Sequence, residues 1–196
     1  NSFYDFDLEH WGFNREKEEA WGSYFSRMRN HPAWGTKNIV AWDVSVQGAR
    51  NMNSLCTANP NIYYFSYVTS NTLLDSSSNR HVPDKSMSYI IRANARLMGM
   101  KKAYYEDGSE TDSTWFENDG IVNKKSMLGP TTGINGPDPI GNYRENDILI
   151  PGQWYVMGEY KSDHRKFVGH SISKNEYNEL IKTYISHLSL LWTLPK

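Results

Sequence analysis

The fold of this chain is decided by residues 62–68, which read Ile-Tyr-Tyr-Phe-Ser-Tyr-Val. Nearly every position is β-branched or aromatic, and such residues favour extended backbone. Pro60 and Asn61 break the chain just before the run. Because the run lacks the alternation of a half-exposed strand, it predicts a strand covered on both faces, as in a parallel sheet.

Helical patterns lie on both sides of that strand. Helices are expected at residues 15–29, 43–56 (with Asp43 as N-cap) and 84–98, and a second strand at residues 154–160. Ser173 and Glu176 have the spacing of a capping box that begins an amphipathic C-terminal helix. Residues 71–79 and 128–152 have turn-forming compositions and are expected to be mostly loop. The alternation of helices with buried strands predicts an α/β architecture with a mostly parallel sheet.

Composition excludes several classes of protein. The chain has 196 residues, of which 38% are hydrophobic and 14% aromatic, so it is too apolar to be disordered. With 21 Lys and Arg against 22 Asp and Glu, no nucleic-acid or polybasic membrane partner is expected. The single cysteine, Cys56, excludes an internal disulfide framework and a cysteine-based zinc site. No apolar run is long enough for a transmembrane helix.

Two polar residues stand out as candidates for chemistry. His164 follows the strand expected at residues 154–160, and functional groups of parallel sheets lie on loops beyond the carboxyl ends of strands. A histidine in that place can act as a general base. Asp119 lies in an Asn-Asp-Gly sequence, which is also a common polar turn. An aspartate followed by a histidine matches the last two members of the hydrolase order Ser, Asp, His.

A nucleophile to complete that order is not found in the chain. Residues 169–173 read Gly-His-Ser-Ile-Ser, close to the Gly-x-Ser-x-Gly elbow. The second glycine is replaced by Ser173, no long apolar strand precedes the turn, and Ser171 follows His164, which is the wrong order. Ser171 is therefore rejected as a nucleophile.

Short motifs that follow one another along nearly the whole chain indicate a family. They are Tyr4-Asp5-Phe6-x-Leu8-x-x-Trp11-Gly12, Tyr24-Phe25-x-Arg27, Pro32-x-Trp34, Asp43-x-Ser45-Val46-x-Gly48-Ala49, Asn59-Pro60-Asn61-x-Tyr63-Tyr64, Trp115-x-Glu117-Asn118-Asp119-Gly120-Ile121-Val122-Asn123-x-x-Ser126-Met127, Met157-Gly158-x-Tyr160, Asp163-His164 and Val168-Gly169. In this order the motifs resemble the large bacterial lipases of bacilli and staphylococci.

The resemblance implies an α/β-hydrolase fold and hydrolysis of triacylglycerols and other carboxylic esters. Matched by motif, Asp119 is the triad acid and His164 the triad base. The nucleophilic serine and the oxyanion hole belong to the family's amino-terminal half, so residues 1–196 are expected to form a partial domain that needs that half as a partner, joined or separate. Ile121 and Val122 could line an acyl pocket, although packing in the sheet core is the simpler interpretation.

The resemblance also bears on metals and location. The family's calcium ligands map to Lys166 and Ser171, with a backbone carbonyl at Ser86, and its zinc carboxylate maps to Asn38. A lysine cannot replace an anionic oxygen ligand, so both metal sites are expected to be weakened or lost, and no cofactor is predicted. Such lipases are usually secreted, which implies an extracellular location.

Two other interpretations stay open. This chain could be a catalytically inactive, lipase-like subunit that binds or assembles, which would explain the missing nucleophile. It could also be one product of a cut near the lid, since it begins with Asn1 rather than methionine.

Overall fold

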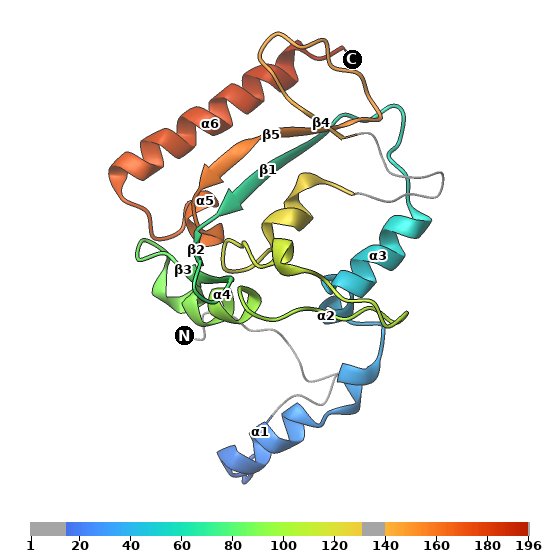
Figure 1. Cartoon of the computed structure of the whole chain (residues 1–196), viewed down its shortest axis with the longest axis vertical. Helices are drawn as coiled ribbons and strands as arrows, with labels where there is room; N and C mark the ends of the chain where they lie inside the picture. Colours follow the sequence, from blue (N-terminus) through green and yellow to red (C-terminus); the bar gives the residue numbers. More distant parts are fainter. Residues whose placement is uncertain (1–14, 131–139, 196) are drawn as a thin grey trace. The chain divides into compact units, whose positions relative to one another are not determined.

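The computed structural model describes residues 15–130 and 140–195 and divides into two compact units, Asn1–Ala49 and Arg50–Lys196 (Figure 1). The motifs at residues 4–12, His10 and part of the loop expected at residues 128–152 lie outside the described residues.

The first unit contains short helices. Its elements are α1 (Trp21–Arg29), the 3-10 turn η2 (Pro32–Gly35), α2 (Val40–Asp43) and the start of α3 (Val46–Leu55). The helix expected from residue 15 begins only at Trp21. Ahead of it the chain forms a turn, in which the Glu19 backbone N–H donates to the Glu16 carbonyl at 3.0 Å and the Glu16 N–H to the Glu19 carboxylate at 3.2 Å.

The prediction that Asp43 caps the next helix is wrong. Asp43 ends α2, and the chain turns before α3 begins. Ser45 takes the capping role, because its Oγ accepts a hydrogen bond from the Gly48 N–H at 3.0 Å. A Cβ on Gly48 would lie 2.0 Å from the Trp42 carbonyl oxygen, so the close approach at this turn requires glycine.

The second unit is built on a parallel sheet with the strand order β1-β5-β4. Its strands are β1 (Tyr64–Ser70), β5 (Trp154–Lys161) and β4 (Ile140–Asn142). The expected parallel sheet flanked by helices is confirmed. Among the described residues β1 pairs with β5 alone, so only Val68 and Thr69 are buried and the rest of β1 is half-buried. The expected cover on both faces is therefore wrong for most of that strand.

A bulge bends β5 near its carboxyl end. Ser66 pairs with Val156, but Val68 pairs with Glu159, so β5 has one more residue than β1 between these pairs. Gly158 lies in the bulge with a φ of 142°, where a side chain would strain the backbone. The bulge thereby sets the path of the strand that leads to His164.

Residues 71–79, expected to be loop, contain the first strand and the turn of a β-hairpin. Its strands are β2 (Thr72–Asp75) and β3 (Arg80–Pro83), which pair antiparallel. The strands were missed because the Ser-rich turn between them gave the whole segment the composition of a loop. His81, for which the sequence indicates no partner, lies 3.1 Å through Nδ1 from the Thr72 hydroxyl, and burial lowers its pKa.

A small apolar core lies beside the hairpin. The helix expected at residues 84–98 is shorter, with a 3-10 turn η3 (Tyr89–Ile91) followed by α4 (Arg92–Met98). Met87, Ile91 and Ala95 form the buried cluster. Two further 3-10 turns, η4 (Ser113–Trp115) and η5 (Lys124–Leu128), precede the segment that leads to β4.

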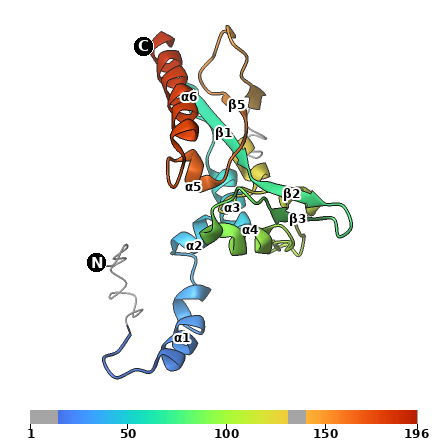
Figure 2. The same ribbon diagram turned by 90° about the vertical axis from the view of Figure 1, so that its left-hand side faces the viewer.

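The C-terminal helices follow β5. They are α5 (His164–Phe167) and α6 (Lys174–Thr193), and the capping box of Ser173 and Glu176 is confirmed. Figure 2 shows α6 running along β1 and β5, where the His187 ring packs edge-on against Phe65 and Tyr67. No helix in the described part of the chain is both long and apolar enough to cross a membrane.

Candidate active site

The two candidate residues come from loops near the carboxyl ends of neighbouring strands. His164 follows β5 directly, as the first residue of α5. Asp119 lies on the loop between η4 and η5, and its carboxylate contacts Thr69 at the end of β1. Strand ends of a parallel sheet meet at one edge, which is where such folds place their ligand sites.

Asp119 is a fully buried carboxylate that makes four hydrogen bonds. Oδ1 accepts the backbone N–H groups of Ile121 and Val122, at 3.0 and 2.8 Å. Oδ2 accepts the Thr69 hydroxyl at 2.7 Å and faces Nδ1 of His164 at 3.0 Å. A buried carboxylate is tolerable only with such partners, so the turn that carries Asp119 stabilises its negative charge.

The neighbours of Asp119 hold this turn in place. Asn118 is also fully buried, and its amide donates to the carbonyls of Ala95 (3.1 Å) and Phe116 (2.8 Å), while its oxygen accepts the Gly120 N–H at 2.9 Å. Gly120 has a φ of 96°, and a Cβ there would lie 2.7 Å from the Ile91 side chain. The Asn-Asp-Gly sequence is thus both a turn and a rigid mount for the carboxylate.

His164 is held on one side and open on the other. Its backbone N–H donates to the Asp119 carbonyl at 3.1 Å, and its side chain remains 42% exposed. Since a carboxylate only accepts, Nδ1 of the neutral ring carries the hydrogen and Nε2 keeps a lone pair. Within residues 15–130 and 140–195, Asp119 is the one hydrogen-bond partner of the ring. The ring can therefore accept a proton at Nε2 while Asp119 stabilises the resulting imidazolium.

Asp163 fixes the start of α5. It is fully buried, and Oδ1 accepts the Lys166 N–H at 3.0 Å as an N-cap. Oδ2 accepts the Ser88 N–H at 2.8 Å, which connects α5 to the segment before α4. In the sequence, Asp163 stands out only as part of a motif. Its place directly before the candidate base, three residues ahead of an amide that it can cap, is the signal that could have identified it.

The other candidate residues lie around this pair. Ile121 is 46% exposed, so its interpretation as a sheet-core residue is wrong, and Val122 is half-buried. A role for both in an acyl pocket remains a prediction. Ser171 is exposed on the loop between α5 and α6 with a φ of 58°. Thr69, which contacts the Asp119 carboxylate, was missed because nothing in its local sequence marks it.

Comparison with known proteins places the chain in a family. Residues 1–189 match the model of the family described as "Lipase-like, C-terminal domain". The chain belongs to this lipase-like family. A curated relative is the lipase of Staphylococcus hyicus, 28% identical over 93% of this chain. Another is lipase 1 of Staphylococcus aureus strain Mu50, 27% identical over 96% of the chain. In both cases the chain covers 26% of the relative's length.

Solved structures give the same result for the fold. EstA from Clostridium botulinum has a TM-score of 0.69 with 31% identity and is aligned over 91% of this chain and 43% of its own. The Staphylococcus hyicus lipase structure has a TM-score of 0.66 with 25% identity, over 97% and 48%. Lipase 1 from Pelosinus fermentans has a TM-score of 0.64 with 31% identity, over 92% and 48%. This lipase-like chain has an α/β-hydrolase fold and spans less than half of each of these structures.

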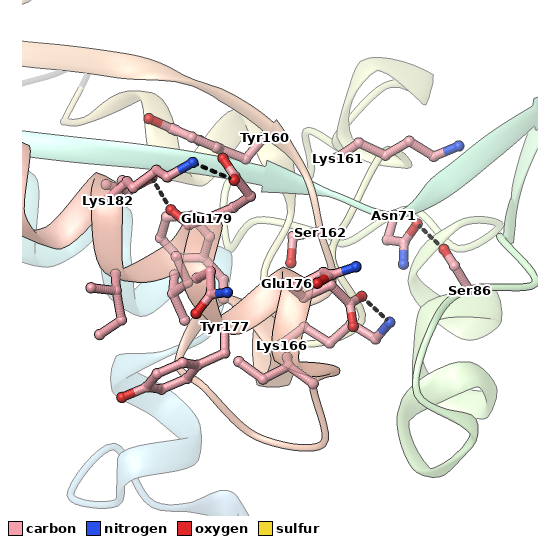
Figure 3. Close-up of a pocket in the computed structure, with 17 residues that line it drawn as sticks. Asn71, Ser86, Tyr160, Lys161, Ser162, Lys166, Glu176, Tyr177, Glu179 and Lys182 are labelled. Atoms are coloured by element: carbon pink, nitrogen blue, oxygen red, sulfur yellow. Dashed lines mark hydrogen bonds and ion pairs between the residues drawn. The ribbon is translucent and has the colours of Figure 1, made fainter.

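A groove lies between α6 and the end of β5 (Figure 3), and neither Asp119 nor His164 is among the residues that line it. Its volume is about 1110 Å³, and each of its lysines is in an ion pair, with Lys161 bound to Asp84 outside the groove. Lys166 and Glu176 are 2.8 Å apart, and Lys182 and Glu179 are 2.7 Å apart. The Lys166 ammonium and the capping contacts of Ser173 lower the pKa of Glu176 to about 2. The groove thus offers no concentrated charge of one sign to a ligand.

The residues that line this groove can be compared with the calcium site that the lipase resemblance implies. Two of the implied calcium positions, Lys166 and Ser86, line it. Lys166 brings an ammonium where a hard cation needs an oxygen anion, and no cluster of three His, Cys, Asp or Glu occurs in the described part of the chain. Asn38, at the implied zinc position, is exposed and offers only a neutral amide oxygen. The residues present do not fit either metal.

Proposed function

We propose that this chain supplies the acid and the base of a Ser-His-Asp triad in a carboxylic ester hydrolase that acts on triacylglycerols or related lipids. The observation that carries the proposal is the 3.0 Å contact between Nδ1 of half-exposed His164 and Oδ2 of fully buried Asp119. Membership of the lipase-like family and the names of its relatives support the substrate class.

The proposed mechanism assigns the proton transfers to His164. Nε2 removes the proton from the serine hydroxyl as the serine oxygen attacks the ester carbonyl carbon, and then donates that proton to the leaving alcohol. A water molecule then attacks the acyl carbon: Nε2 takes a proton from the water and returns it to the serine oxygen as the fatty acid leaves. Asp119 stays ionised throughout, keeps the hydrogen on Nδ1 and stabilises the imidazolium that forms twice in each cycle.

The serine is proposed to come from an amino-terminal segment, joined to this chain or separate. The chain spans about a quarter of the curated relatives it matches, which leaves room for such a segment. Among the described residues β1 has no strand on its outer side, and an unpaired strand edge can accept another strand in parallel. A further proposal, based on likeness to the family, is that the protein acts outside the cell.

Binding of calcium or zinc is not part of the proposal. The ion pair of Lys166 and Glu176 occupies the groove where the resemblance would place calcium ligands. We therefore propose that folding and hydrolysis proceed without either ion.

The direct test is ester hydrolysis by the polypeptide that carries this chain together with its amino-terminal half. His164→Ala should lower kcat at least about 1,000-fold, since removal of the base leaves only binding and the oxyanion hole. His170→Ala is the matched control, because His170 is an exposed histidine six positions further along the same loop region. It should leave the rate within about twofold of wild type.

Two results would overturn the proposal. One is hydrolysis that survives His164→Ala unchanged. The other is a wild-type protein, complete with the amino-terminal half, that hydrolyses no ester, which would favour the inactive binding subunit instead.

A further inference from the structure

The acid of the proposed triad has a second side-chain partner. Oδ2 of Asp119 lies 2.7 Å from Oγ1 of Thr69 and 3.0 Å from Nδ1 of His164, so the two donors share one oxygen. Thr69 is only 4% exposed and belongs to β1, which is far from Asp119 in the sequence. The arrangement therefore joins the strand, the acid and the base.

We infer that Thr69 is a positioning residue of this site: its hydroxyl fixes the oxygen of Asp119 that faces His164 and sets how strongly that oxygen attracts the imidazolium. The inference rests on the proposed function. It goes beyond it by assigning a role to a residue that never touches the ester or the serine.

The direction of the Thr69 hydrogen bond follows from its surroundings. A hydroxyl has one hydrogen to donate, and Thr69 Oγ1 has two acceptors near it, Oδ2 of Asp119 at 2.7 Å and Sδ of Met127 at 3.4 Å. An ionised oxygen at the shorter distance is much the stronger acceptor. The Thr69 backbone N–H donates to the same sulfur at 3.2 Å, which holds the residue beside Met127. The hydroxyl is thus directed at the carboxylate.

The two oxygens of Asp119 are held by different parts of the chain. The N–H groups of Ile121 and Val122 hold Oδ1, and both belong to the same turn as Asp119. Thr69 holds Oδ2 from β1. The turn alone would let the carboxylate pivot about Oδ1, whereas the contact with Thr69 fixes its plane. Because threonine is β-branched and has few side-chain rotamers, little entropy is lost in holding that geometry.

The shared oxygen has an electrostatic consequence. A hydrogen bond from Thr69 withdraws electron density from Oδ2, so the attraction of that oxygen for protonated His164 is moderated. Removal of the hydroxyl should strengthen the remaining contact with Nδ1 and make protonation of His164 easier. A purely structural role for Thr69 would lower stability without this effect.

The test compares Thr69→Val with Thr69→Ser in the polypeptide that includes the amino-terminal half. Valine keeps the shape and the strand preference but has no hydroxyl, whereas serine keeps the hydroxyl. In Thr69→Val the acid limb of the kcat/KM profile should move up by about 0.5 to 1 pH unit. The kcat value should fall about three- to tenfold, because a carboxylate that can pivot orients His164 less well for proton transfer, and KM should stay within about twofold because binding is not affected.

A proton NMR measurement gives a readout that needs no turnover. The low-field resonance of the His164 Nδ1–H should move further downfield in Thr69→Val, because the hydrogen bond to Oδ2 becomes stronger. Thr69→Ser should keep both the resonance and the pH profile near wild type. If the valine variant does not fold, Thr69→Ala carries the same expectations, since it also lacks the hydroxyl.

The outcomes separate this inference from the proposed function. Suppose that hydrolysis depends on His164, but that the folded Thr69→Val variant keeps the wild-type pH profile and resonance. That result would overturn the role of Thr69 alone. Shifts of equal size in Thr69→Ser would also overturn it, because they would follow from side-chain shape. Hydrolysis that does not depend on His164 at all would overturn the proposed function itself.

Discussion

The acid and base sides of the candidate site are built in opposite ways. Asp119 is fully buried, accepts hydrogen bonds at both oxygens and lies on a turn held by buried Asn118. His164 is 42% exposed, and within the described residues its ring contacts one hydrogen-bond partner. This chain thus surrounds the proposed acid with hydrogen-bond partners of its own but leaves one side of the proposed base exposed.

That asymmetry agrees with what each residue must do in the proposed mechanism. A buried carboxylate that stays ionised needs fixed hydrogen-bond donors in place of water, and all of these can be present before any substrate binds. A base that exchanges protons with a serine and an alcohol must present Nε2 to groups outside this chain. The two sides should therefore respond differently to substitution.

The largest effect is expected on the acid side. Asp119→Ala leaves the Thr69 hydroxyl and the Ile121 and Val122 amides without their acceptor, so the free energy of unfolding should fall by about 3–5 kcal/mol and kcat by about 10,000-fold. Urea unfolding and ester hydrolysis measure the two effects. His164→Ala, the comparison on the base side, should change the free energy of unfolding by less than about 1 kcal/mol. Equal losses of stability in the two variants would contradict the asymmetry.

The second-largest loss of stability is expected at Asp163, which caps the helix that begins with His164. Asp163→Ala removes the acceptor for the backbone amides of Ser88 and Lys166, so the free energy of unfolding should fall by about 2 kcal/mol. Asp163→Asn should lose less, because its one amide oxygen can still accept the capping N–H of Lys166, while its NH2 group faces the Ser88 N–H without accepting from it. A loss as large in Asp163→Asn as in Asp163→Ala would contradict a contribution from the capping hydrogen bond.

The aromatic packing next to α5 should give a smaller, pH-dependent effect. Tyr67 packs against Tyr160 and Phe167, and burial, followed by the nearby tyrosines 160, 184 and 143, raises its pKa to about 12 from 10.0. Because the unfolded chain loses this proton first, the contribution of Tyr67 to stability is complete below pH 10 and is lost between pH 10 and 12. Tyr67→Phe should remove that part of the alkaline loss. Thermal unfolding from pH 9 to 12 tests it, and parallel curves for both proteins would disprove it.

The smallest effect is expected from removing metal ions. Because Lys166 stands where the resemblance implies a calcium ligand and pairs with Glu176, EDTA should shift the unfolding midpoint by less than about 1 °C and leave hydrolysis unchanged, since no ion is bound to be lost. Stoichiometric calcium or zinc in the purified protein, measured by elemental analysis, would contradict this expectation.

The sequence predicted what depends on local pattern and on motif. The parallel sheet, the strand ending near residue 160 and the capping box at Ser173 all follow from composition, periodicity and spacing. The hairpin at β2 and β3 was missed, because its strands are short and its turn resembles any polar loop. The predicted cover on both faces of β1 was wrong for most of the strand, because the helices and loops that cover a sheet come from distant parts of the chain that a local pattern does not specify.

The candidate site shows the same division. His164 was selected from its place after a strand, Asp119 from its order ahead of a histidine, and both from the family motifs. The structure brings them together, while their catalytic roles stay predictions. Thr69 could not be selected, because its hydrogen bond joins residues on separate segments whose proximity exists only in the folded chain. The sequence around a threonine on a strand does not indicate which distant residue its hydroxyl will bind.

The most direct test of the central claim is labelling with a fluorophosphonate, which reacts with activated serines. In the polypeptide that includes the amino-terminal half, the label should attach to one serine outside residues 1–196, and His164→Ala should abolish labelling while His170→Ala keeps it. Labelling of a serine within this chain, such as Ser171, or labelling at the wild-type rate in His164→Ala, would contradict the account.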